Sequence, residues 1–209
     1  MPANRRGGLI VISAPSGAGK TTLVHNALAS HNGLAFSISY TTRPPRPRER
    51  NGVDYCFVTE GEFQDMISND EFLEWARVFG RWYGTSRASV ESLRAAGKTV
   101  LLEIDWQGAE QIRQREPSAV SVFILPPSRA ELERRLRGRG TDTKENIGRR
   151  LREAVTDMAQ WEKFDYVLIN EDVDTAVSEF KAILDGRADA YRVDSPMVRR
   201  RARRILADG

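Results

Sequence analysis

The feature that most constrains the fold is a short apolar run followed by a glycine-rich loop and a helical segment near the start of the chain. Residues 9–12 are Leu-Ile-Val-Ile, and residues 14–21 read Ala-Pro-Ser-Gly-Ala-Gly-Lys-Thr. A helical pattern then covers residues 20–29, so the order is strand, loop and helix, which is half of a βαβ unit. The loop matches the phosphate-binding pattern G-x-x-x-x-G-K-[ST], except that Ala14 stands at the first glycine.

The residue types of this loop suit a bound phosphate. Backbone N–H groups of a glycine-rich turn can curl around a phosphate, and the positive end of the following helix points at it. The Lys20 ammonium then meets the terminal phosphate oxygens, and the Thr21 hydroxyl is predicted to bind Mg²⁺. A turn that merely joins strand to helix is the alternative, but the Lys-Thr pair directly after the loop argues against it. The predicted nucleotide-binding residues are Ala14, Pro15, Ser16, Gly17, Ala18, Gly19, Lys20, Thr21 and Thr22.

Further along the chain, apolar runs alternate with charged helical segments. Turn-forming residues bound each run, which is typical of parallel strands that are buried on both faces. The alternation predicts an α/β fold with a doubly wound parallel sheet, of the type found in phosphate-loop NTPases. The expected strands are residues 9–12, 99–104, 120–125 and 166–169, and the expected helices after the first are residues 89–96, 107–115, 128–137, 144–164 and 175–188.

Two segments interrupt this alternation. Residues 37–97 include a Pro-Arg stretch that cannot be helical, followed by short aromatic-rich runs, so they predict an inserted, partly β subdomain. Residues 137–150 begin with a polar, glycine-flanked turn between two helical patterns and predict a helical lid. We therefore expect one domain over residues 1–209, with a core formed by residues 7–36 and 98–188 and a basic tail over residues 189–209.

Composition excludes several kinds of protein. The 209 residues contain one cysteine, Cys56, and two histidines, so neither an internal disulfide nor a Cys/His metal site is expected. No apolar run is long enough for a signal peptide or a membrane span. These observations predict a cytoplasmic protein that does not contact membranes.

The positive net charge comes from the end of the chain. Residues 187–209 hold seven Arg and three Asp, a net charge of +4, and subtracting this from the total of +3 leaves −1 for the rest. A nucleic-acid-binding surface over the whole molecule is therefore not expected. For the arginines themselves, a solvated helix end is favoured over binding to nucleic acid or to an acidic partner.

A phosphate loop alone fits a GTPase, an ATPase, a transporter subunit or a small-molecule kinase, and the segments that follow it narrow the choice. They are residues 39–46 (SYTTRPPR), 52–58 (GVDYCFV), 72–76 (FLEWA), 83–85 (YGT), 104–108 (IDWQG) and 138–141 (GRGT). In this order, together with the loop, they resemble guanylate kinases over about residues 9–188.

The resemblance implies phosphoryl transfer from ATP to GMP, which makes ADP and GDP, with Mg²⁺ bound beside the ATP phosphates. It implies that the GMP phosphate is bound by Arg43, Arg46, Tyr55 and Tyr83. Planar guanidinium groups are suited to a dianionic phosphate, and phenol hydroxyls are neutral donors beside them. A Pro-Arg turn in solvent is the alternative for the arginines, and the tyrosines downstream argue against it.

The resemblance also implies a guanine-reading side that contains Ser39, Glu74, Thr85 and Asp105. Guanine presents N1–H and an exocyclic amine side by side, so the Glu74 carboxylate can accept from both. Adenine has an acceptor at N1 and would leave that carboxylate unpaired. Many relatives have serine at the position of Thr85, and the hydroxyl is kept here.

Lid arginines are implied to reach the ATP phosphates. Arg139 and Arg150 match the family positions, and Arg135 matches less well. With Lys20 and Arg43 they form the predicted catalytic set, because the GMP phosphate is already an anionic nucleophile and needs no general base. Positioning and charge neutralisation are then the main contributions of the protein.

Two residues at the ends of predicted strands stay open. Glu103 shares a strand face with Asp105 and is a candidate for orienting metal-bound water. Asn170 closes another strand, where an asparagine is more typical of a turn than of an adenine contact.

Two other functions remain as alternatives. A non-catalytic guanylate-kinase-like interaction module would typically have an eroded phosphate loop, whereas Lys20, Thr21 and Arg139 are all present. An ATP-dependent sugar-phosphate kinase would have no use for a guanine-reading carboxylate. The expected partners are the small molecules ATP and GMP, with activity on dGMP and the oligomeric state left open.

Overall fold

A computed structural model describes residues 6–78, 80–138 and 144–208, with side chains left undescribed at residues 144–147. It contains two compact units, Met1–Val11 with Asn32–Val120, and Ile12–His31 with Ser121–Gly209. The central sheet has the strand order β2-β7-β1-β8-β9 and a second sheet has the order β4-β3-β6-β5, which confirms the predicted α/β class. The central strands are β1 (Leu9–Ser13), β2 (Leu34–Phe36), β7 (Thr99–Glu103), β8 (Val120–Leu125) and β9 (Tyr166–Ile169).

In the first unit, β2 and β7 pair in parallel with Leu34 opposite Thr99. Val100, Leu101 and Leu102 of β7 are all buried, as expected for a strand covered on both faces. Helices α3 (Arg87–Ala95) and α4 (Trp106–Arg115) precede and follow this strand. The short β2 was not predicted, because three residues are too few to show a periodic pattern.

The second sheet lies within residues 37–97 and confirms that this insertion is partly β. Its strands β5 and β6 pair in antiparallel fashion, with β5 at one edge of the sheet and Glu74 opposite Thr85. A helix, α2 (Glu60–Ser68), was missed. Its capping box was visible in the sequence, since the Thr59 side chain accepts from the Glu62 N–H and Glu62 accepts from the Thr59 N–H. The strands are β3 (Tyr40–Thr41), β4 (Cys56–Phe57), β5 (Phe72–Val78) and β6 (Arg81–Ser86).

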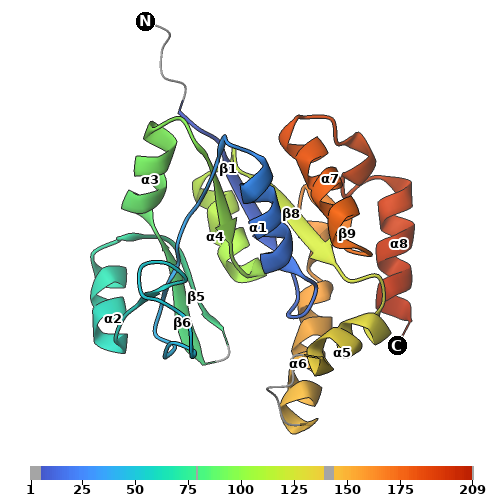
Figure 1. The fold of residues 1–209 in the computed structure, drawn as a ribbon, viewed down its shortest axis with the longest axis horizontal. Helices are drawn as coiled ribbons and strands as arrows, with labels where there is room; N and C mark the ends of the chain where they lie inside the picture. The colour runs from blue at the N-terminus through green and yellow to red at the C-terminus, as the bar shows by residue number, and fades with distance from the viewer. Residues whose placement is uncertain (1–5, 79, 139–143, 209) are drawn as a thin grey trace, which may run out of the picture. The chain divides into compact units, whose positions relative to one another are not determined.

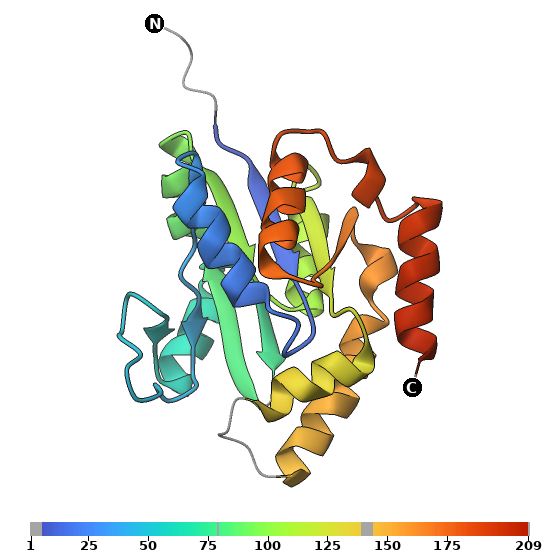
Figure 2. The ribbon, with the colours of Figure 1, turned by 45° about the vertical axis from the view of Figure 1, so that its right-hand side comes forward.

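In the second unit, α1 (Lys20–Ser30) and α7 (Val173–Leu184) lie side by side, as Figures 1 and 2 show in blue and orange. The strands β8 and β9 pair in parallel from Val122 opposite Tyr166 onward. Helices α5 (Arg129–Arg137) and α6 (Lys144–Met158) also contact each other. Residues 139–143 of the predicted lid lie outside the described residues.

Two predicted helix ends are wrong. The helix expected over residues 144–164 ends at Met158, and a separate 3-10 turn, Trp161–Lys163, follows it. The helix expected over residues 175–188 ends at Leu184, because Gly186 adopts a left-handed φ of 69° that terminates it. Backbone hydrogen bonds from Gly186 N to Ile183 O and from Arg187 N to Ala182 O close that end.

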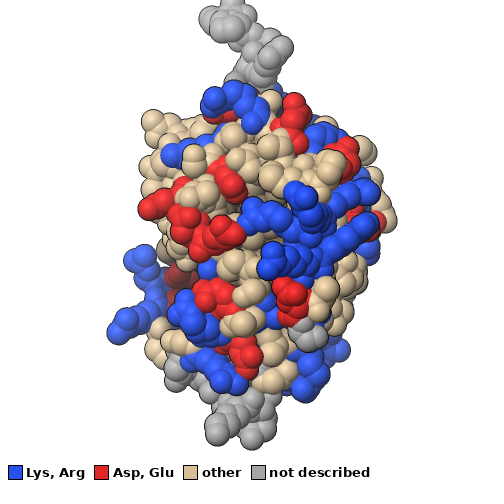
Figure 3. Space-filling view, turned by 90° about the vertical axis from the view of Figure 1, so that its right-hand side faces the viewer, with Lys and Arg blue, Asp and Glu red and all other residues tan. Residues whose placement is uncertain are grey.

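The basic segment expected as a tail contains a helix, α8 (Pro196–Ala207). Val198, Ala202 and Ile205 are buried on one face of it, so the helix packs on the second unit rather than projecting into solvent. At the edge of this buried face Arg201 pairs with Glu171 at 2.5 Å. Figure 3 shows Lys and Arg side chains gathered on the side where α8 lies in Figure 1, with acidic side chains next to them.

Among the residues described, no helix is long and apolar enough to cross a membrane.

Candidate active site

The glycine-rich loop has the conformation that its sequence predicts. Gly17 and Gly19 adopt φ values of 94° and 92°, in the left-handed region that favours glycine. A Cβ on Gly17 would also press on Leu132 and Leu136 of α5 at 3.0 Å. Gly19 is the N-cap of α1, so the N–H groups at the start of this helix lie next to the loop.

Two side chains of the second unit hold the loop through a single carbonyl. Asn170 Nδ2 donates to Ala18 O at 2.7 Å, and Arg135 Nη1 donates to the same oxygen at 3.4 Å. Arg135 Nη2 also donates to Asn170 O at 3.1 Å. The sequence left the role of Asn170 open between a turn and an adenine contact, and the structure places its buried side chain against the loop. Its position at the carboxyl end of a parallel strand was the observation that could have indicated this contact.

The predicted catalytic residues of this unit are only partly described. Arg150 Nη2 donates to Ser16 Oγ at 2.6 Å, which brings α6 to the loop. Lys20 and Thr21 form the first turn of α1, directly after the loop. Arg139 lies outside the described residues. The other predicted loop residues, Ala14, Pro15 and Thr22, lie on the same continuous stretch of chain, where Pro15 O accepts from Ala18 N at 3.2 Å.

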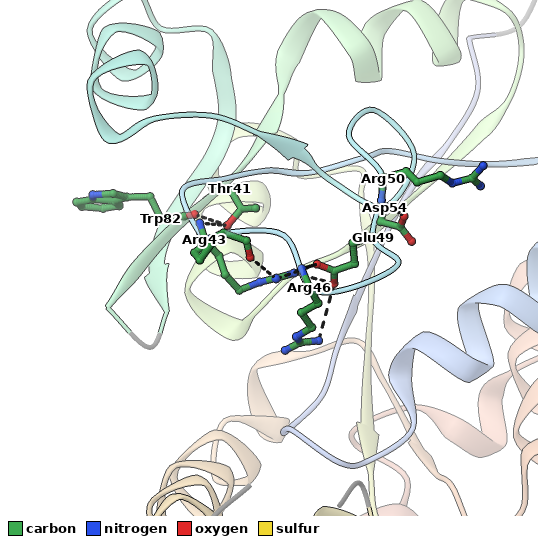
Figure 4. Close-up of polar contacts among 8 residues, drawn as sticks. Thr41, Arg43, Arg46, Glu49, Arg50, Asp54 and Trp82 are labelled. Carbon is green, nitrogen blue, oxygen red and sulfur yellow. Dashed lines mark hydrogen bonds and ion pairs between the residues drawn. The ribbon is translucent and has the colours of Figure 1, made fainter. Parts of the chain in front are cut away.

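In the first unit, the two predicted phosphate-binding arginines meet at one carboxylate, that of Glu49 (Figure 4). Arg43 Nη1 and Nη2 each donate to Glu49 at 2.9 Å, an arrangement with two parallel hydrogen bonds. The Arg46 N–H donates to Glu49 Oε2 at 2.7 Å, and its guanidinium lies 3.9 Å from the other oxygen. Glu49 was not predicted. The Arg-x-x-Arg-x-x-Glu spacing within a turn was the pattern that could have indicated it.

Tyr55 and Tyr83 lie beside the same arginine. The Arg43 Cζ lies 5.2 Å from the centre of the Tyr55 ring, and the two tyrosine rings meet edge to face at 6.1 Å. Burial, together with the negative charge of Glu103, raises the pKa of Tyr55 to about 12. Near neutral pH the Tyr55 hydroxyl is therefore protonated and can donate a hydrogen bond.

The predicted guanine-reading residues Glu74 and Thr85 form a direct pair. Thr85 Oγ1 donates to Glu74 Oε1 at 2.5 Å, and both residues are almost fully buried. Glu74 Oε2 lies against Gly108 of α4, where a Cβ would overlap it. A carboxylate this buried requires hydrogen-bond partners, which makes its direction well defined.

Asp105 and Ser39 have local structural contacts as well. Asp105 is the N-cap of α4, and its side chain accepts from Gly108 N at 2.9 Å and from Gln107 Nε2 at 3.0 Å. Ser39 is buried, and its carbonyl accepts from Cys56 N at 2.9 Å. Within the first unit, the structure thus groups the predicted phosphate-binding residues Arg43, Arg46, Tyr55 and Tyr83, and it separately pairs Glu74 with Thr85.

A parallel sheet whose first strand leads through left-handed glycines to a lysine at a helix N-terminus defines a phosphate-loop nucleotide-binding protein. The family model for guanylate kinase matches residues 6–187. The chain belongs to the guanylate kinase family, whose members are ATP-dependent nucleoside monophosphate kinases that phosphorylate GMP.

Individual relatives agree over nearly the full length. The guanylate kinase of Alkalilimnicola ehrlichii is 48% identical over 200 residues, covering 96% of this chain and 98% of that protein. The guanylate kinase of Escherichia coli K12 is 48% identical over 207 residues, covering 97% and 99%. The crystal structure of guanylate kinase from Anaplasma phagocytophilum is similar with a TM-score of 0.73 and 34% identity, covering 88% of each chain. The alternatives of an interaction module and a sugar-phosphate kinase are not favoured.

Proposed function

We propose that the chain transfers the terminal phosphoryl group of ATP to GMP with Arg43, Arg46, Tyr55 and Tyr83 binding the GMP phosphate. The observation that supports this assignment is the convergence of these residues within the first unit. The Arg43 side chain is only 15% exposed, yet its guanidinium already binds an anion, Glu49, with two parallel hydrogen bonds. A phosphate presents oxygens that a guanidinium binds in the same two-point manner. The GMP phosphate would therefore join or replace Glu49 on Arg43.

Glu74 is the proposed guanine-reading group, with Thr85, Ser39 and Asp105 around the base. Its carboxylate can accept from guanine N1–H and from the exocyclic amine. Thr85 donates to one oxygen and so restrains the carboxylate plane before the base binds. An adenine base would place an acceptor against this carboxylate, and a buried unpaired charge can lower reactivity by about 10⁴-fold.

The ATP side is proposed to consist of residues 14–22, with Lys20 neutralising charge on the transferred phosphate. The Thr21 hydroxyl and the ATP phosphates are suitable ligands for a metal ion that binds together with the nucleotide. No group of three or more His, Cys, Asp or Glu that could hold a metal occurs in the part of the chain that the structure describes. Mg²⁺ commonly keeps several waters and takes only one or two protein oxygens beside substrate phosphates, and the Thr21 hydroxyl would supply one. When bound, Mg²⁺ would neutralise charge on the phosphates.

Catalysis is proposed to depend on positioning rather than on proton abstraction, since the GMP phosphate is already anionic. Arg150 contacts the loop through Ser16, and Arg135 contacts it through Ala18, so both are proposed to neutralise charge on the ATP phosphates. Arg139 is proposed for the same role on the basis of the sequence pattern alone. We also propose a cytoplasmic location, since the single Cys56 suits a reducing compartment.

The test is the preference of the Glu74→Gln variant among nucleoside monophosphates. An amide has one acceptor and two donors, so it can no longer accept from both guanine groups. We expect the ratio of kcat/KM for GMP over AMP to fall sharply, with the KM for ATP unchanged. A coupled assay with ATP, Mg²⁺ and each of GMP, dGMP, AMP and IMP measures this. An unaltered GMP preference in Glu74→Gln would show that base recognition lies elsewhere.

A further inference from the structure

The outer edge of β5 is closed by side chains of α4. Because β5 is the last strand of its sheet, backbone groups on its outer side have no strand partner. Gln111 of α4 supplies one: the Trp75 N–H donates to Gln111 Oε1 at 3.2 Å, and Gln111 Nε2 donates to Trp75 O at 2.6 Å. The side-chain amide therefore pairs with the residue next to Glu74 as a neighbouring strand would.

Arg115 makes the equivalent contact on the other side of Glu74. The β5–β6 register shifts between Phe72 and Glu74, so Leu73 is the extra residue of a bulge. Arg115 Nη1 donates to Phe72 O and to Leu73 O, both at 2.9 Å. A bulge changes the direction of the side chains beside it, and a guanidinium on its carbonyls holds that geometry.

These residues share one face of α4. Gly108, Gln111 and Arg115 are spaced i, i+3 and i+7, which places them along one side of the helix. Gly108 lies against Glu74 Oε2, while the other two bind the backbone on either side of Glu74. Glu74 is therefore oriented from three directions, namely Thr85 across the sheet, Gly108 facing it and the α4 side chains along the strand.

We propose that Gln111 and Arg115 are positioning residues for guanine recognition, which act by holding the β5 backbone so that the Glu74 carboxylate faces the base. The inference rests on the proposed role of Glu74. Neither residue needs to touch the substrate. A carboxylate that must accept two neighbouring guanine donors at once tolerates little displacement, because a misplacement of about 1 Å can cost about 10²-fold in rate.

The experiment compares Gln111→Met with Gln114→Met in the full-length enzyme. Methionine has nearly the volume of glutamine but forms neither hydrogen bond to Trp75. Gln114 lies on the same helix and is exposed, so Gln114→Met controls for the general effect of replacing a glutamine of α4 by methionine. IMP is the decisive second substrate, because it keeps N1–H and lacks the exocyclic amine. The measurements are KM and kcat for GMP, IMP and ATP, with the thermal midpoint of each variant.

We expect Gln111→Met to raise the KM for GMP by about tenfold, the size that corresponds to one hydrogen bond. The preference for GMP over IMP should fall with it, while kcat at saturating GMP and the KM for ATP stay unchanged. A lower thermal midpoint with an intact GMP-over-IMP preference would overturn the proposal, since a purely structural role predicts that result. Gln114→Met should match the unmodified enzyme.

Two further variants keep the test decisive. If Gln111→Met does not fold, Gln111→Glu keeps the acceptor for the Trp75 N–H and loses the donor, and Arg115→Met tests the bulge separately. Either should lower the GMP-over-IMP preference, and no change in both would overturn the proposal. The Glu74→Gln variant distinguishes a failure of this inference from a failure of the proposed role of Glu74. If it abolishes the preference while the α4 variants do not, only this inference fails, and if it has no effect, the role of Glu74 itself fails.

Discussion

The phosphate loop and the proposed GMP-binding region are both expected to bind phosphate, but they are built in different ways. The loop is one continuous stretch, residues 14–22, and its conformation follows from two glycines with left-handed φ values. The acceptor region takes its side chains from several separate segments, with Arg43, Tyr55 and Tyr83 up to 40 residues apart in the chain. The Arg43 guanidinium there is oriented by the Glu49 side chain and by the Pro44 carbonyl.

This difference determines how each region responds to substitution. In the loop, backbone N–H groups are the main donors, so most side chains there can change as long as the glycines and Lys20 remain. In the acceptor region, every proposed donor is a side chain, and neighbouring groups orient it. Changes at residues that never meet the substrate, such as Glu49 and Gln111, should therefore matter in the acceptor region.

The largest expected effect is that of Lys20→Ala in the loop. This change removes the ammonium at the start of α1 that is proposed to neutralise charge on the transferred phosphate, and we expect kcat to fall by about 10³-fold. The measurement is steady-state turnover of ATP and GMP, with exposed Lys163 replaced by alanine as the control. If Lys20→Ala kept most of the turnover, the backbone of the loop alone would be sufficient for transfer.

Arg43→Ala should have the next largest effect and should act only on the acceptor. Removing Arg43 takes away the main phosphate-binding guanidinium and leaves Glu49 partly buried without it, so we expect the KM for GMP to rise by about 10²-fold. The KM for ATP should not change. Arg50→Ala is the matched control, because the Arg50 side chain points away from Arg43 and Glu49 in Figure 4. An equal rise of the KM for GMP in both variants would contradict the proposed role of Arg43 in binding the GMP phosphate.

The smallest effect should appear in the pH dependence of stability. Hydrogen bonds from the Arg43 guanidinium hold the pKa of Glu49 below its ordinary value. The pair therefore stabilises the fold above the ordinary glutamate pKa of about 4.3, and this contribution is lost as the pH falls through the lowered value. We expect the free energy of unfolding to drop less steeply from about pH 6 to about pH 3 in Glu49→Gln than in the unmodified chain.

A double variant checks the origin of that difference. In an Arg43→Ala background, Glu49→Gln should change the slope of stability against pH less than it does in the unmodified chain, because the carboxylate keeps only its contacts with Arg46. Denaturant titrations at each pH give the free energy of unfolding, and hence its slope against pH, for each variant. The same slope change in both backgrounds would show that other groups lower the pKa of Glu49.

Sequence patterns predicted the buried strands well and the ends of helices less well. Apolar runs such as residues 120–125 coincide with a strand, because burial on both faces requires continuous apolar side chains. The end of α7 was missed, since a helical pattern continues past Gly186 even though the backbone there turns left-handed. The basic end was predicted to be a solvated helix end, and most arginines of α8 are indeed exposed. The burial of Val198, Ala202 and Ile205 on one face of that helix was not predicted.

The sequence by itself determined the phosphate loop and the family, because a phosphate site made of consecutive backbone groups is written in consecutive residues. The partners of the side chains were decided only by the tertiary structure. Asn170 on Ala18 and Gln111 on the edge of β5 both depend on segments that meet after folding. Their hydrogen bonds follow from the directions of groups distant in sequence, and no local pattern encodes those directions.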